Sequence, residues 1–181
     1  MNKKVLWITE TAVMLALLVA LQAITKPMGQ LVTGSFVNAI LAVTVLLPGL
    51  YSGLTVALIS PILAFLLGIA PQILTVPAIM AGNAAYVALL YAIAGNHSKK
   101  ILRQIIAWIC AASVKFAVLY SIVAWLICGV LADQLLAAGM LKQPMLKALP
   151  ATFGITQLFT ALIGGAVALL IVPVLRKALK K

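Results

Sequence analysis

Long runs of apolar residues constrain this chain more than any other feature of its sequence. The runs recur along all 181 residues and are separated by short segments that contain glycine, proline or basic residues. A helix needs about 20 apolar residues to cross the hydrocarbon core of a bilayer. A soluble domain has about 25% charged residues, whereas this chain has 8% charged and 65% hydrophobic residues. The sequence therefore predicts an integral membrane protein.

The apolar runs and the breaks between them predict six membrane spans. We place these spans at about residues 5–24, 35–47, 51–69, 72–94, 104–131 and 151–175. The first run has no small-residue cleavage pattern followed by a polar segment, so we expect it to remain as a span. The length leaves no room for a separate soluble module. We expect an all-α fold in which residues 1–181 form a single bundle of six transmembrane helices.

The distribution of basic residues predicts the orientation of the bundle. The net charge is +11, but the basic residues lie at the chain ends and in one loop, which fits lipid headgroups and not nucleic acid. Nine of them share one predicted side: Lys3, Lys4, Lys99, Lys100, Arg103, Arg176, Lys177, Lys180 and Lys181. Three lie on the other: Lys26, Lys142 and Lys147. Cytoplasmic segments carry the excess of Lys and Arg, so we expect both termini in the cytoplasm.

One basic residue, Lys115, lies inside a predicted span. It is about eleven residues into the fifth run, which at about 1.5 Å per residue is near the middle of the bilayer. A lysine at this depth costs roughly 2.5–3.5 kcal/mol on insertion scales. Because its helical neighbours, including Trp108, are apolar, we expect a pocket for a largely apolar ligand with one anionic group, typically a carboxylate. The alternative is a lysine that bonds a backbone carbonyl or reaches the membrane interface.

Several amide side chains fall at similar predicted depths in other spans. Asn83 matches the depth of Lys115, and Asn38 and Gln157 fall in the outer halves of their spans. This clustering favours a cavity open toward the outside, although amides in membranes also simply bond neighbouring helices. The predicted substrate-binding residues are Lys115, Asn83, Asn38, Gln157, Trp108 and Gln72.

Two connectors are candidates for covering this cavity. Residues 25–35 are rich in turn formers, and two glycines would let this segment move or approach a ligand closely. We expect a lid here, formed by Lys26, Gly29, Gln30 and Gly34, with a plain turn as the alternative. Residues 133–150 are amphipathic and predict a second flap or an interfacial helix.

Other features of the sequence bear on partners and on catalysis. Ala12, Ala16 and Ala20 form a smooth stripe on the first span, which would bind a partner protein if it faces outward. Cys110 and Cys128 lie in one apolar run, and the chain has neither H-E-x-x-H nor G-x-S-x-G. We therefore expect no metal, no cofactor and no enzymatic activity.

Three features of the chain carry a family resemblance: its compact six-span architecture, its basic loop between spans four and five, and the segment Ala12-Val13-Met14-Leu15-Ala16. In these features the chain is similar to the substrate-binding S component of an energy-coupling factor (ECF) transporter. The resemblance implies a multi-pass protein of the bacterial cell membrane that binds a vitamin-like micronutrient in its outer half. It implies that Ala12 and Ala16, with Ala20 as an extension, contact a transmembrane T subunit, which two cytoplasmic ATPase subunits drive.

Combined with the position of Lys115, the resemblance predicts uptake of a small carboxylate of the lipoate, pantothenate, niacin or biotin class. The bundle would bind it outside and deliver it by reorienting against the T subunit. The alternatives are a solitary membrane carrier or facilitator for a small organic solute and a small membrane enzyme.

Overall fold

All regular structure in the described part of the chain is helical, as the sequence predicts. The computed structural model describes residues 2–69, 72–95 and 101–179. The α-helices are α1 Lys3–Thr25, α2 Gln30–Leu46, α3 Leu50–Leu66, α4 Val76–Ala94, α5 Ile101–Leu119, α6 Ala132–Ala137, α7 Met145–Phe153 and α8 Ile155–Ala178. Two short 3-10 turns, Lys26–Met28 and Ile73–Thr75, precede α2 and α4, and the π-helix η3 (Tyr120–Val130) continues α5. The predicted basic loop around Lys99 and Lys100 lies largely outside the described residues, as do Lys180 and Lys181.

Within the described residues, four segments are long and apolar enough to cross a membrane. They are Lys3–Met28, Ile73–Ala94, Ile101–Val130 and Met145–Ala178. The helices α2 and α3 are apolar but shorter, with 17 residues each. At about 1.5 Å per residue, 17 residues span about 25 Å, slightly less than the roughly 30 Å of hydrocarbon. Six crossings and the orientation of the termini remain predictions.

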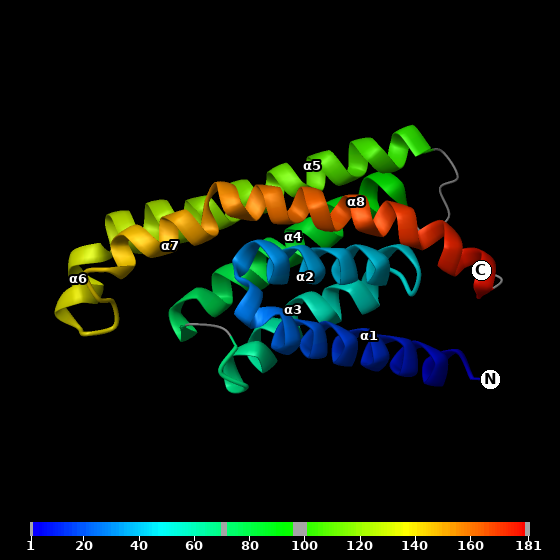
Figure 1. Ribbon diagram of the computed structural model, residues 1–181, viewed down its shortest axis with the longest axis horizontal. Coiled ribbons are helices and arrows are strands. Elements are labelled where there is room, and N and C mark those ends of the chain that lie inside the picture. The colour runs from blue at the N-terminus through cyan, green and yellow to red at the C-terminus, as the bar shows by residue number, and fades with distance from the viewer. Residues whose placement is uncertain (1, 70–71, 96–100, 180–181) are drawn as a thin grey trace.

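The helices form a bundle in which both termini lie at the same end (Figure 1). The continuous α5 and η3 run beside α7 and α8, and this pair extends past the other helices, with α6 at its far tip (Figure 1). The first connector, between α1 and α2, lies away from the two termini because α1 runs from the N-terminus toward the end that carries α7 (Figure 1). The fold therefore has one end with the termini and one end with this connector and α7.

Helix α2 is the centre of the bundle. Its residues from Asn38 to Leu46 are all buried, as expected for a helix that is apolar all round. It packs most extensively against α8, where Gly34 of α2 and Gly164 of α8 allow close approach. A Cβ atom on Gly34 would lie 2.8 Å from Thr160 Cγ2. Gly34 thus lies within α2 and packs on α8, where the sequence predicts a connector, and its part in gating remains a prediction.

The predicted second connector, 133–150, is largely helical and belongs to a second apolar cluster. It contains most of α6, a turn at Gly139 with φ of 69°, and the start of α7. Leu149 and Phe153 of α7 pack with Leu119 and Val123 of the α5–η3 helix. The last predicted span is also longer than expected, because α7 leads into α8 after a break at Gly154.

The alanine stripe of α1 faces away from the bundle. Ala12, Ala16 and Ala20 are exposed, whereas Thr11 and Leu18 on the other face are buried. Thr11 Oγ1 donates a hydrogen bond of 2.8 Å to Ser52 Oγ of α3. The stripe therefore faces outward, which is the arrangement that the predicted surface for binding a partner protein requires.

Candidate binding cavity

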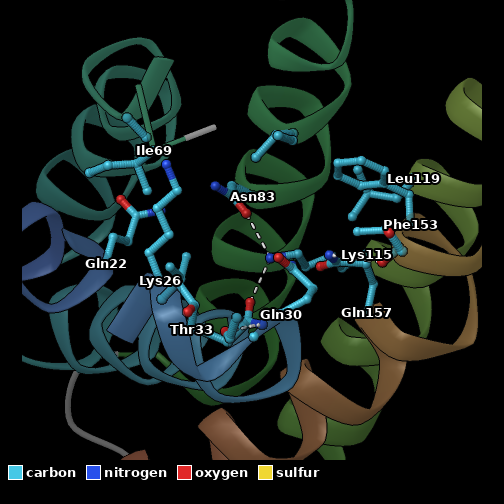
Figure 2. A pocket seen from close by; sticks show the side chains of 17 residues that line it. Gln22, Lys26, Gln30, Thr33, Ile69, Asn83, Lys115, Leu119, Phe153 and Gln157 are labelled. Carbon is cyan, nitrogen blue, oxygen red and sulfur yellow. Dashed lines mark hydrogen bonds between the residues drawn. The ribbon is translucent and has the colours of Figure 1, made fainter. Parts of the chain in front are cut away.

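A buried lysine lies between three helices near the middle of the bundle. Lys115 of α5 is only 2% exposed. Its Nζ donates hydrogen bonds of 2.6 Å to Asn38 Oδ1 of α2 and 2.7 Å to Asn83 Oδ1 of α4, and Figure 2 shows both bonds. Charge-assisted bonds of this length are strong, and they offset part of the cost of taking an ammonium out of water. The sequence argument that Lys115 and Asn83 lie at one depth is confirmed.

An aromatic ring also contacts this ammonium. Lys115 Nζ lies 5.7 Å from the ring centroid of Tyr86, which is fully buried on α4. Tyr86 follows Asn83 by three residues, so both side chains are on one face of the helix. A desolvated cation over a ring gains about 2 kcal/mol. The tyrosine therefore stabilises the charged lysine without lining the cavity.

The amide of Asn38 is oriented by bonds on its other side. Its Nδ2 donates to Gly34 O at 2.9 Å and to Thr160 Oγ1 at 3.2 Å. Thr160 Oγ1 in turn donates to Gln157 O at 3.0 Å. Because both amide hydrogens of Asn38 are engaged, its Oδ1 is the atom that faces Lys115.

A cavity of about 140 Å³ opens beside this network. Its polar lining consists of Gln22, Lys26, Gln30, Thr33, Asn38, Asn83, Lys115, Thr152 and Gln157. The other lining residues are Gly29, Gly34, Val37, Ala64, Ile69, Ile79, Leu119 and Phe153. An engineered protein cavity of about 150 Å³ accepts benzene, so this volume holds roughly one six-membered ring. Because the lining includes the first connector and the end of α7, the cavity lies toward the end of the bundle away from the termini.

The structure brings together most of the residues that the sequence singled out. Of the predicted substrate-binding residues, Asn38, Asn83, Lys115 and Gln157 line the cavity. All four predicted lid residues, Lys26, Gly29, Gln30 and Gly34, line it as well. Their roles in binding and gating remain predictions.

Two predicted binding residues lie elsewhere, and placing them at the cavity was wrong. Trp108 Nε1 donates to Ala161 O at 3.3 Å, and its indole fills the space over Gly165 of α8. Gln72 Nε2 contacts Met145 Sδ at 2.7 Å. The position of a residue along a span predicts its depth, but the direction of its side chain around the helix depends on packing.

The predicted lid is mostly helical. Only Gly29 separates the turn Lys26–Met28 from α2, and its φ of 88° suits glycine alone without strain. Thr33 Oγ1 donates to Thr25 O at 2.8 Å across the turn. Lys26 Nζ donates to the carbonyl of Gly68, after α3. The segment is thus a tight turn tied to two helices.

Sequence reasoning missed several residues of the site. Gln22, Thr33, Thr152 and Phe153 line the cavity, and Tyr86 contacts Lys115. A signal for Gln22 is present in the sequence, because it precedes Lys26 by four residues and so shares its helix face.

The described side chains that line the cavity give it a positive charge. Two ammonium groups, Lys26 and Lys115, line it, and no carboxylate side chain is among its lining residues. Within residues 2–69, 72–95 and 101–179, no three His, Cys, Asp or Glu side chains come together as metal ligands. The arrangement suits an anionic group bound in a largely apolar chamber.

Comparisons with known proteins give one match. The family model described as ECF transporter, substrate-specific component, matches residues 8–176, a range that includes every residue lining the cavity. No curated protein and no solved structure matches the chain.

Proposed function

The chain belongs to the substrate-specific components of ECF transporters, and we propose that it captures a small, largely apolar carboxylate in the cavity around Lys115. It is a membrane-embedded transport protein of a family that is not enzymatic. Such components bind small molecules and work with a T subunit and ATPase modules. We propose the lipoate, pantothenate, niacin or biotin class as its substrates.

The observation that carries this proposal is a buried ammonium that lines a cavity with no carboxylate side chain among its lining residues. Lys115 Nζ has three N–H donors, and two of them go to Asn38 and Asn83. The third is available to a ligand oxygen. A carboxylate bound here would neutralise a charge that otherwise stands in a low-dielectric interior, where such pairing is favourable if geometry is good.

We propose six crossings with both termini in the cytoplasm of a bacterial cell. The excess of basic residues on the terminal side supports this orientation, and the common end of the two termini (Figure 1) fits an even number of crossings. In that orientation the cavity opens to the outside. A substrate would enter past Lys26 and the turn at Gly29.

The turn between α1 and α2 is the proposed gate. The present volume of about 140 Å³ holds a single ring, so a longer acid requires the mouth to widen. Release of Lys26 from the Gly68 carbonyl, with rotation at Gly29, is the smallest change that does so. Gly34 stays in place because it packs against α8.

For transport, we propose that Ala12, Ala16 and Ala20 contact the T subunit. They form an exposed, small-residue stripe on α1, and small residues let helices approach closely within a bilayer. Two cytoplasmic ATPase subunits would drive the reorientation that delivers the substrate inside.

The test is the Lys115→Met variant, which keeps an unbranched side chain only one heavy atom shorter and removes the charge. We expect it to lower the affinity for the carboxylate about 10- to 150-fold, corresponding to about 1.5–3 kcal/mol for a hydrogen bond to a charged group. Lys142→Met is the matched control, because Lys142 is exposed and lies outside the cavity. Calorimetric titration in detergent micelles measures both. Unchanged affinity in Lys115→Met would exclude the carboxylate function.

A further inference from the structure

Two polar atoms at the cavity have no hydrogen-bond partner in the protein, and they indicate which polar groups a ligand would carry besides its anionic group. Asn83 is 1% exposed, and its Nδ2 has no hydrogen-bond partner in the protein. Gln22 Oε1 is also buried without a partner. Both side chains line the cavity, and buried polar groups without partners are rare and costly. A ligand that satisfies both atoms would therefore gain affinity from each.

The first atom belongs to the anion end of the cavity. Asn83 Oδ1 accepts from Lys115, so Nδ2 of the same amide is a donor next to the ammonium. The unused N–H of Lys115 and the amide N–H of Asn83 together offer two donors. A carboxylate has two acceptor oxygens, and one oxygen can bind each donor.

The second atom lies on the opposite wall. Figure 2 shows Gln22 beside Lys26, across the cavity from Asn83 and Lys115. A carbonyl oxygen of an amide can only accept. A ligand group that presents an O–H or N–H to this part of the cavity would therefore satisfy Gln22 Oε1.

We infer that the ligand carries an O–H or N–H donor remote from its carboxylate, and that Gln22 accepts this hydrogen bond. The inference rests on the proposed function and narrows its substrate class. Pantothenate has hydroxyl groups and an amide N–H, and biotin has ureido N–H groups. Nicotinate and lipoate have no such donor at neutral pH. Gln22 is then a specificity-determining residue.

The experiment titrates the full-length protein in detergent micelles with these four acids. We expect pantothenate or biotin to bind at least about tenfold more tightly than nicotinate and lipoate. In the Gln22→Met variant, which has no acceptor there, the affinity for the preferred acid should fall about tenfold. Gln134→Met is the matched control, because Gln134 is exposed on α6, and it should leave the affinity unchanged.

The outcomes separate this inference from the proposed function. The inference is overturned if nicotinate or lipoate binds most tightly, or if Gln22→Met and the unaltered protein have equal affinity. In either case, a loss of binding in Lys115→Met still supports the carboxylate function. Binding that survives Lys115→Met overturns both, as does failure of all four acids to bind. The comparison among acids uses the unaltered protein, so it decides the inference even if Gln22→Met does not fold.

Discussion

Asn38→Leu is expected to destabilise the protein strongly, although it replaces an amide by an apolar group of similar size inside a membrane bundle. In the structure Asn38 accepts a 2.6 Å hydrogen bond from the Lys115 ammonium and donates to Gly34 and Thr160. The variant leaves a buried charge with one amide partner. Losing a hydrogen bond to a charged group costs about 1.5–3 kcal/mol, and with the two weaker bonds we expect about 2.5–4 kcal/mol.

A double-mutant cycle isolates the part of this loss that comes from the charge. In Lys115→Met the ammonium is absent, so adding Asn38→Leu should cost only about 1 kcal/mol for the bonds to Gly34 and Thr160. The coupling energy should therefore be about 1.5–3 kcal/mol. Lys115→Met alone should be milder than Asn38→Leu, because it removes the buried charge together with its bonds.

Reversible unfolding in mixed detergent micelles gives the four free energies of the cycle. The matched control is Ser113→Ala, because Ser113 is an exposed residue of α5 that bonds only its own helix. A coupling energy within about 0.5 kcal/mol of zero, the range found for independent sites, would refute the view that Asn38 supports the charge of Lys115.

Three further predictions test the remaining surfaces of the bundle. Ala16→Trp should leave ligand affinity unchanged in titrations but abolish uptake by cells that contain the T and ATPase subunits. Leu170→Trp, at an exposed position of α8, is the control and should preserve uptake. Transport by Ala16→Trp would exclude the stripe as a contact with the T subunit. Gly164→Ala should destabilise the protein by about 1–3 kcal/mol in micelle unfolding, because its Cβ would collide with the backbone of α2 and overpacking costs this much. Gly129→Ala, with its nearest atom at 3.5 Å, should have little effect, and equal losses would contradict the packing argument. Trp108→Phe should leave ligand affinity within about twofold, because the indole contacts α8 outside the cavity; a tenfold loss would return Trp108 to the binding site.

The apolar runs and a few misplaced polar residues allowed much of this molecule to be predicted. A helix is the structure that satisfies every backbone hydrogen bond within a single apolar segment, so the all-α fold follows from composition and run length. Lys115 and Asn83 were predictable because an ionisable or amide group in hydrocarbon requires a partner, and depth follows from counting residues at a fixed rise.

Helix ends and side-chain directions were harder to predict. Residues 25–35 have the composition of a loop, yet most of them are helical because α2 packs closely on α8 through Gly34. Trp108 and Gln72 have suitable chemistry and spacing, but packing turns one toward Gly165 and the other toward Met145. Gln22 was overlooked although it precedes Lys26 by four residues and so shares its helix face, because the sequence alone does not show which way that face points.

The sequence by itself determined that this chain forms apolar helices, that Lys115 is out of place in them, and that its alanine stripe is smooth. Each of these properties depends on the chemistry of a residue and its position along one helix. Only the tertiary structure decided that Asn38, Asn83 and Lys115 meet, that Gln22 faces them across the cavity, and that the stripe points outward. Those relations depend on how the helices rotate and cross. Side-chain packing between segments that are distant in sequence sets both the rotation and the crossing.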